Sequence, residues 1–230
     1  MSVLYIVATP VGNLKDISLR ALEILREVDL ILCEDTRQTR KLLDCYQIKT
    51  QTISYHQHSQ LSKVEYIIQL IREGKNLALV SDAGTPGISD PGNRLVELVI
   101  RELGERVNVV PIPGASALVA AASISGFPMD RFIFLGFPPV KNKRKKFFEE
   151  VASSKYPVVF YESPYRIIKT LTELQATYNS SHSLNYTYVV VCRELTKKFE
   201  TIYRGTTEEI IGRLQKEGPR GEFVITAAKR

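Results

Sequence analysis

The chain has 230 residues, of which 44% are hydrophobic and 24% charged, a balance typical of a globular protein with a buried core and unlike that of a disordered chain. No apolar run reaches the roughly 18 to 20 residues that cross a bilayer, and residues 1–8 lack the features of a signal peptide, so we expect a cytoplasmic protein. The net charge of +6 is compatible with a polyanionic partner but does not require one.

The first half of the chain alternates strand-like and helix-like segments. This rhythm predicts a largely parallel sheet with helices on both faces. The expected strands are 3–8, 29–34, 52–55, 77–81 and 107–112, and the expected helices are 16–27, 37–44, 61–73, 94–103 and 115–123.

The pattern changes after Gly126-Phe127-Pro128, which we interpret as a linker between a domain of residues 1–125 and a domain of residues 126–230. The second domain combines helices with strands that include an antiparallel pair, 186–193 with 199–203. Its other expected strands are 132–136, 158–161 and 222–228, and its helices are 145–152, 165–178 and 207–216. We therefore predict an α/β protein with an N-terminal parallel-rich sheet and a C-terminal mixed α+β domain.

Three loops that follow strands are rich in glycine and proline. The longest reads SDAGTPGISDPG over residues 81–92, and residues 9–13 and 111–117 are similar. Glycine lets the backbone approach a ligand closely, and proline lowers the entropy lost on ordering a loop. Ligands of parallel sheets bind beyond the carboxyl ends of strands, so these loops predict one shared pocket, with ordinary βα turns as the alternative. Neither the dinucleotide fingerprint nor a P-loop occurs, which disfavours dinucleotides and nucleoside triphosphates.

Seven segments between residues 9 and 200 carry a resemblance to a known family. They are TPVGNLKDIS, CEDTRQTRKLL, SDAGTPGISDPG, VVPIPGASA, FLGFPP, FYESPYR and RELTKKFE. In this order they resemble the bacterial 16S rRNA (cytidine-2′-O)-methyltransferases of the tetrapyrrole-methylase superfamily. One departure is Tyr165, where the family usually has histidine.

The resemblance implies S-adenosylmethionine as the methyl donor, bound in a cleft between two α/β domains. It also implies a homodimer and, as substrate, a decoding-centre cytidine of 16S rRNA in the small ribosomal subunit. Together with the strand-end rule, it implies that a set of loop and strand-end residues binds the donor. These residues are Pro10, Gly12, Asp82, Ala83, Gly84, Pro86, Ile88, Ala115, Ser116, Leu135 and Tyr161.

Transfer of a methyl group to a ribose hydroxyl requires alignment of the reactants and is helped by a proton acceptor, but it does not require a metal. Polar residues at strand ends are the catalytic candidates: Glu34, Asp35, Arg37, His56 and Glu162. Asp35 has an alternative interpretation as a helix cap, and Glu162 precedes a natural helix start at Ser163-Pro164.

No metal site is expected from the sequence. His56 and His58 share a face if the segment is extended, as metal ligands or RNA contacts would, but no third ligand is evident. Cys33, Cys45 and Cys192 are far apart and form neither a disulfide framework nor a zinc motif.

Two clusters of cations are candidates for phosphate contacts. The first lies within residues 141–146, KNKRKK, and comprises Lys141, Lys143, Arg144, Lys145 and Lys146; a solubilising helix start is the alternative. The second comprises Arg193 and Lys197, for which a cross-strand ion pair is the alternative.

Two other functions remain open at this point. A methylase of a tetrapyrrole or another small molecule would need little surface basicity, so the clustered cations favour a polyanionic substrate. A non-catalytic, ribosome-associated RNA-binding module would not need three glycine- and proline-rich loops at one pocket.

Overall fold

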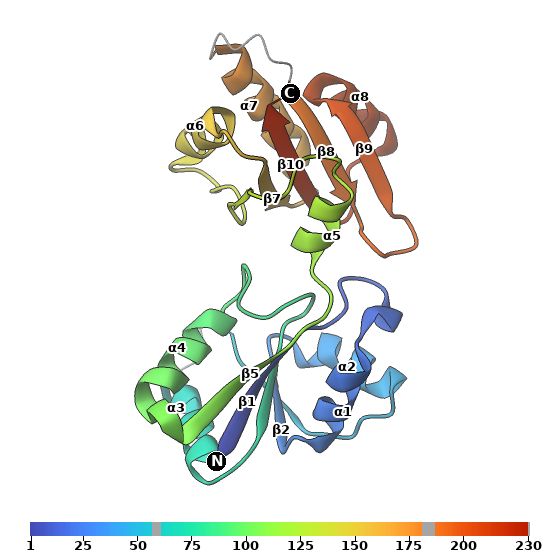
Figure 1. The fold of residues 1–230 in the computed structure, drawn as a ribbon. Helices are drawn as coiled ribbons and strands as arrows, with labels where there is room; N and C mark the ends of the chain where they lie inside the picture. Colours follow the sequence, from blue (N-terminus) through green and yellow to red (C-terminus); the bar gives the residue numbers. More distant parts are fainter. Residues whose placement is uncertain (57–60, 181–186, 230) are drawn as a thin grey trace. The chain divides into compact units, whose positions relative to one another are not determined.

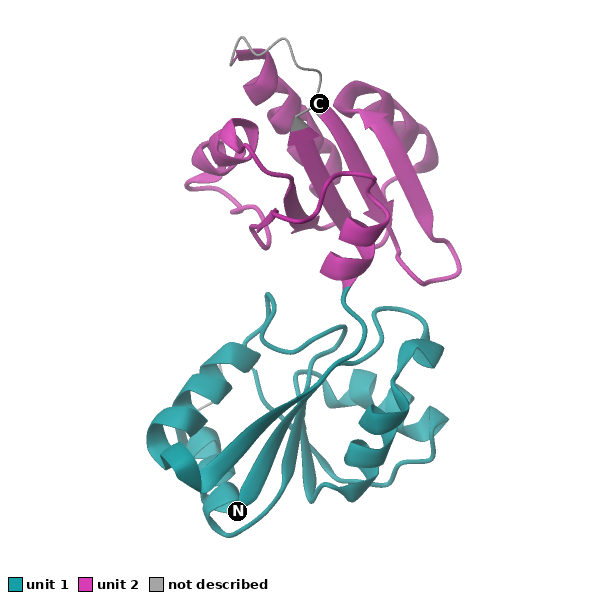
Figure 2. Cartoon of the chain, viewed as in Figure 1, with its two compact units in different colours: residues 1–116 teal, residues 117–230 magenta. Residues whose placement is uncertain are grey.

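The computed structural model describes residues 1–56, 61–180 and 187–229, which form two compact units (Figure 2). Unit 1 is Met1–Ser116 and unit 2 is Ala117–Arg230. Each unit has its own sheet and its own hydrophobic core.

Unit 1 contains a five-stranded sheet in which all neighbouring strands are parallel (Figure 1). The strands are β1 (Ser2–Val7), β2 (Leu30–Cys33), β3 (Thr52–Ser54), β4 (Leu77–Val80) and β5 (Val107–Ile112). Their order is β3-β2-β4-β1-β5, so the chain runs outward from β1 to β3, returns to β4 and crosses to β5 on the other side of β1. The direction of winding therefore reverses beside β1, where ligands of such sheets bind.

Helices cover both faces of this sheet (Figure 1). They are α1 (Leu19–Glu27), α2 (Thr36–Cys45), α3 (Leu61–Arg72) and α4 (Gly92–Leu103), with 3₁₀ turns at Leu14–Asp16 and Gly104–Arg106. Ile31 and Ala78 lie in the core beneath α1 and α2, whereas Leu32 and Leu79 lie in the core beneath α3 and α4. Both faces are buried, which explains why β2 and β4 are apolar throughout.

Unit 2 contains a mixed sheet of order β6-β7-β10-β8-β9, in which β6 and β7 are parallel and the other pairs antiparallel. The strands are β6 (Ile133–Phe134), β7 (Val158–Glu162), β8 (Thr187–Arg193), β9 (Thr201–Thr206) and β10 (Phe223–Lys229). The helices are α5 (Ala117–Ser123), α6 (Arg144–Ser153), α7 (Ile167–Ser180) and α8 (Thr207–Glu217).

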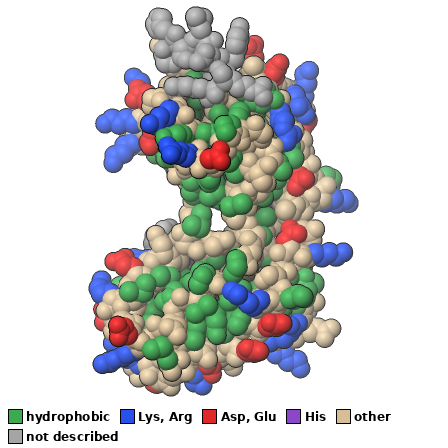
Figure 3. Space-filling view, viewed as in Figure 1, with side chains coloured by type: hydrophobic (Ala, Val, Ile, Leu, Met, Phe, Trp, Pro, Cys, Tyr) green, Lys and Arg blue, Asp and Glu red, His purple; other side chains and the backbone are tan. Residues whose placement is uncertain are grey.

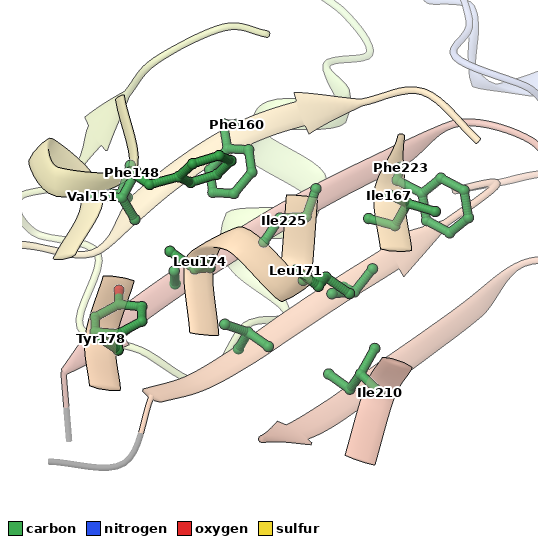
Figure 4. Close-up of a cluster of buried hydrophobic side chains, with 14 of the residues drawn as sticks. Phe148, Val151, Phe160, Ile167, Leu171, Leu174, Tyr178, Ile210, Phe223 and Ile225 are labelled. Atoms are coloured by element: carbon green, nitrogen blue, oxygen red, sulfur yellow. The ribbon is translucent and has the colours of Figure 1, made fainter. Parts of the chain in front are cut away.

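The second core has two sides because side chains of its strands alternate between the faces of the sheet. Phe160 of β7 lies in one buried cluster with Phe148, Leu171 and Ile210 of α6, α7 and α8 (Figure 4). Val159, its neighbour in β7, packs on the opposite face against α5.

The structure confirms the predicted fold class, including the antiparallel pair β8 and β9. The helix expected over 16–27 begins only at Leu19, because the Ser18 side chain caps it by accepting a hydrogen bond from the backbone N–H of Ala21. The compact units divide after Ser116, earlier than the linker at Gly126, because Ala121 of α5 packs in the core of the second sheet. Within the described ranges, none of the helices is long and apolar enough to span a membrane.

Candidate functional site

The loops after β1 and β4 are joined by backbone hydrogen bonds at the carboxyl edge of the parallel sheet. The Thr9 N–H donates to the Gly84 carbonyl over 2.9 Å, and the Gly84 N–H donates to the Thr9 carbonyl over 3.0 Å. The Thr9 hydroxyl donates to the Ser81 carbonyl over 3.0 Å. Gly84 has a φ of +82°, which a residue with a side chain rarely adopts.

The loop after β5 lies against the other two. The Thr85 hydroxyl donates to the Ala115 carbonyl over 3.3 Å. A Cβ atom at Gly114 would lie 3.0 Å from the Cβ of Ala8, so a side chain at this position would crowd Ala8. The three glycine- and proline-rich loops therefore lie together, as the sequence predicted.

The loop between β4 and α4 is held in shape by Asp90. One of its carboxylate oxygens accepts the backbone N–H groups of Gly87 and Gly92, both over 2.7 Å. A Cβ atom at Gly92 would lie 2.8 Å from the nitrogen of Gly87 and 2.9 Å from that same carboxylate oxygen, closer than real Cβ contacts. Glycine at this position is a condition for the loop to close.

The residues predicted to bind the donor fall in both units. Leu135 and Tyr161 belong to unit 2, where the Tyr161 ring packs against Phe134 and Phe137 and its burial raises the pKa of the phenol. The others lie in the loops of unit 1. Pro10, Gly84 and Pro86 are buried, Ala115 and Ser116 are partly buried, and Gly12, Asp82, Ala83 and Ile88 are exposed.

Asp35 caps α2, which confirms the alternative interpretation of this residue. Its carboxylate accepts the Arg37 backbone N–H over 2.8 Å and pairs with the Arg37 guanidinium over 2.7 Å. These bonds lower the pKa of Asp35 to about 2, so its carboxylate is a poor proton acceptor at neutral pH. The Arg37 side chain is exposed.

Glu34 and Asp82 have raised pKa values. Partial burial is the main cause for both; the charges of Asp90 and Asp82 add to it for Glu34, and the charge of Asp35 adds to it for Asp82. The backbone N–H of Asp82 also binds the Glu34 carboxylate, and the Asp82 carboxylate accepts the Asp35 N–H over 3.1 Å. The ends of β2 and β4 thus hold three interacting carboxylates.

A pocket of about 600 Å³ opens beside these carboxylates. Two of its lining residues, Glu34 and His56, were predicted from the sequence. The others, Ser89, Asp90, Pro91, Asn93 and Arg94, were not predicted. Asn93 and Arg94 stand in the first turn of α4, which follows the 81–92 loop.

The part of the chain that the structure describes contains no group of three His, Cys, Asp or Glu residues suited to a metal ion. His58, considered with His56 as a metal ligand, lies outside the described residues.

Glu162 is fully buried in unit 2, in a network that occupies both carboxylate oxygens. One accepts the backbone N–H of Ser163 over 2.6 Å and pairs with Arg166 over 3.0 Å; the other accepts the Thr170 hydroxyl over 2.6 Å. Arg144 lies 4.0 Å from the same carboxylate. Glu162 was predicted as a catalytic residue. In the structure both of its carboxylate oxygens are occupied by contacts that stabilise unit 2.

Arg144 was predicted to contact phosphate, and the structure gives it an internal role. Its guanidinium pairs with Glu173, donates to Thr170 and the Pro139 carbonyl, and stacks over Phe148. Only 7% of its side chain is exposed. The remaining cations of this cluster are exposed; they are Lys141, Lys143, Lys145 and Lys146. Cationic side chains are visible on the side of unit 2 that carries α6 (Figure 3).

The second cluster of cations is paired within unit 2, as the alternative interpretation held. Lys197 lies 2.9 Å from Glu194 and 2.8 Å from Glu222. Arg193 donates to the Arg220 carbonyl over 2.7 Å, and only 14% of its side chain is exposed. These contacts engage both cations within the protein.

Comparison with known proteins places this geometry in a family. A family model described as Tetrapyrrole (Corrin/Porphyrin) Methylases matches residues 3–211. Among solved structures, a cobalt precorrin-4 methyltransferase of cobalamin biosynthesis has a TM-score of 0.72, covering 98% of this chain and 94% of its own at 22% identity. This likeness shows a shared fold.

Two relatives found by sequence are more similar to this chain than that solved structure is. Ribosomal RNA small subunit methyltransferase I of Synechocystis sp. is 46% identical over 99% of this chain and 79% of its own length. The protein of the same name from Thermotoga maritima is 43% identical over 98% of this chain and 97% of its own length.

Proposed function

The chain belongs to the tetrapyrrole (corrin/porphyrin) methylase family, and from this premise we propose that it is a methyltransferase that acts on the RNA of the small ribosomal subunit. The observation that carries the proposal is the relative of that name, which is 46% identical over nearly the whole chain. We propose further that S-adenosylmethionine is the donor and the 2′-oxygen of a 16S rRNA cytidine is the acceptor.

The residues at the carboxyl edge of unit 1 fit such a donor. Asp82 offers a carboxylate to a cationic ligand, and Ile88, 44% exposed, offers an apolar surface to a purine. Backbone groups at Gly12 and Ala83 are accessible beside them. S-adenosylmethionine would supply an electrophilic methyl group on a positively charged sulfur. The contribution of the loops is to bind and orient it, and Asp90 and Gly92 fix the shape of the loop between β4 and α4.

The acceptor hydroxyl is best placed next to the pocket of Glu34 and His56. These two residues line one pocket, whereas Asp35 is tied to Arg37, and Glu162 is enclosed in the core of unit 2. The raised pKa of Glu34 makes its carboxylate a better hydrogen-bond acceptor toward the target nucleotide than that of Asp35. No step of this transfer needs a metal.

A small-molecule methylase is the less supported function. A small-molecule methylase of this family would have the same fold as this chain, so the fold does not exclude it. The solved cobalt precorrin-4 methyltransferase, however, is only 22% identical to this chain. The four exposed lysines around the start of α6 suit a polyanion.

We propose further that the protein is a homodimer and that it works in the cytoplasm, where small ribosomal subunits are found. Sedimentation of the full chain tests the assembly: a particle of twice 26.0 kDa supports a dimer, and one of 26.0 kDa opposes it.

The test of function is transfer of radiolabelled methyl from S-adenosylmethionine to purified small subunits, with nuclease mapping of the labelled nucleotide. We expect label on the 2′-oxygen of one cytidine. Donor binding without transfer to the subunit would favour the small-molecule methylase, and absence of donor binding would favour a non-catalytic RNA-binding module.

A further inference from the structure

The pocket beside β2 and α4 is lined by residues outside the set predicted to bind the donor. Its volume of about 600 Å³ lies within the range of small-molecule sites, roughly 300 to 1,000 Å³. Its lining combines one carboxylate on the end of β2 with an amide and a guanidinium on the first turn of α4: Glu34, Asn93 and Arg94.

The pocket shares a wall with the loop proposed to bind the donor. Asp90, which fixes that loop through Gly87 and Gly92, also lines the pocket. Glu34 receives the backbone N–H of Asp82, another residue of the loop. A ligand in the pocket would therefore lie next to the donor, as the acceptor of a methyl transfer must.

Two polar side chains of the pocket, those of Glu34 and Arg94, are available to a ligand. Glu34 is partly buried, and within the described ranges its carboxylate accepts a hydrogen bond only from the Asp82 backbone. Among the residues that the structure describes, the exposed Arg94 guanidinium forms no ion pair. A carboxylate that only accepts thus faces the same pocket as a guanidinium that only donates.

We infer that this pocket receives the base of the target nucleotide and selects cytosine, Glu34 accepting from the exocyclic amino group and Arg94 donating to the ring nitrogen and carbonyl oxygen. The inference rests on the proposed function and adds the means of base selection. A base in a stacked helix could not enter such a pocket, so the nucleotide must be single-stranded or extruded.

Uracil has the opposite pattern at two positions of the same edge. It carries a carbonyl oxygen where cytosine has its amino group, so it would face the Glu34 carboxylate with no hydrogen between the two oxygens. Because Glu34 is partly desolvated, water cannot fully compensate for the missing hydrogen bond. A matched hydrogen-bonding pair of this kind discriminates between bases by roughly 5- to 150-fold.

The test compares the wild-type chain with Glu34→Gln on small subunits that carry either cytidine or uridine at the methylated position. The readout is the ratio of kcat/KM for the two substrates. We expect the wild type to prefer cytidine, and Glu34→Gln to reduce that preference by roughly 5- to 150-fold, because an amide can donate to the uracil oxygen. Arg94→Ala should raise KM more for the cytidine substrate than for the uridine substrate, because the ring nitrogen of uracil carries a hydrogen and cannot accept from the guanidinium.

Controls keep a failure of this inference separate from a failure of the proposed function. Glu97→Gln and Arg101→Ala remove exposed charges elsewhere on α4 and should leave the ratio and KM unchanged. Calorimetric binding of S-adenosylmethionine should be unchanged in Glu34→Gln, which also shows that the variant is folded. No transfer by the wild type would overturn the proposed function. Transfer with an unchanged cytidine preference in Glu34→Gln would overturn base selection alone.

Discussion

The two units use their polar residues in opposite ways. In unit 1, Glu34, Asp82 and Arg94 stand at strand and helix ends around accessible loops and a pocket. In unit 2, Arg144 and Glu162, also singled out from the sequence, are buried against each other and their neighbours. Arg144 shows that a charged residue in a basic run can be buried, whereas Glu34 and Asp82 beyond the ends of β2 and β4 stay accessible in part or in full.

Topology explains the difference. All strands of unit 1 end at one edge, so the loops that follow them meet there and leave polar groups facing a pocket. In the mostly antiparallel sheet of unit 2, neighbouring strands end at opposite edges, and charged residues at those ends pair locally, as Lys197 does with Glu194 and Glu222.

The largest effect should come from breaking the buried network of unit 2. Arg144→Ala leaves Glu173 without its guanidinium partner and removes a cation close to the buried Glu162. We expect a decrease of about 3 to 5 kcal/mol in the free energy of unfolding, measured by denaturant titration with circular dichroism.

Lys145→Ala is the matched control from the same segment. Its exposed pair with Glu149 is worth less than about 0.5 kcal/mol. Equal stability of the two variants would remove the distinction between Arg144 and its lysine neighbours.

The next effect should come from the donor loop of unit 1. Gly92→Ala places a Cβ atom 2.8 Å from the Gly87 nitrogen and must displace the loop. A shift of about 1 Å can cost roughly 100-fold in methyl transfer, and donor affinity measured by calorimetry should fall with it.

Gly212→Ala provides the control, because nothing lies within 4 Å of a Cβ atom at this position of α8. This variant should keep full donor affinity and gain about 0.5 to 1 kcal/mol of stability. Wild-type affinity in Gly92→Ala would mean that the donor does not use this loop.

A smaller effect should separate the exposed cations of unit 2 from the paired ones. Replacing Lys141, Lys143, Lys145 and Lys146 together by alanine should flatten the salt dependence of RNA binding. The slope of log K against log salt should drop by about 0.7 to 0.9 for each phosphate group that the variant no longer binds. Lys197→Ala should leave the slope unchanged, since Glu194 and Glu222 already bind this cation. Filter binding at several salt concentrations measures both, and equal slopes for all proteins would contradict the assignment.

The smallest effect concerns acid stability at the cap of α2. Arg37 lowers the pKa of Asp35 from 3.8 to about 2, so the carboxylate stabilises the folded state above pH 4, and this contribution disappears as the pH falls through about 2. Asp35→Asn keeps a capping side chain but removes the charge. Its stability should therefore lie below that of the wild type at pH 5 and converge with it near pH 2 in acid unfolding experiments. A difference that persists at pH 2 would show that capping geometry, and not charge, is responsible.

The strands, the helices and the three joined loops could be predicted from the sequence. The strands and helices follow from the spacing of apolar residues, and the loops follow from their glycine and proline content. Arg144 shows where a charge run misleads. It precedes Phe147, Phe148 and Val151 at spacings of three, four and seven, which place it on the buried face of α6. Because Arg144 stands among lysines, its helical spacing to these buried residues was overlooked.

Arg94 and Asn93 could not be found from local pattern, because nothing in the sequence says that the first turn of α4 approaches the ends of β2 and β3. Their place depends on the strand order, in which β4 lies next to β2. The buried partners of Glu162 depend in the same way on how α6 and α7 pack.

The most direct test of the central claim, that the carboxyl edge of unit 1 binds the methyl donor, is amide hydrogen exchange of the full chain with and without S-adenosylmethionine. The account predicts slower exchange in residues 9–13 and 81–92, where the joined loops lie. Donor binding that leaves exchange in both loops unchanged would contradict it.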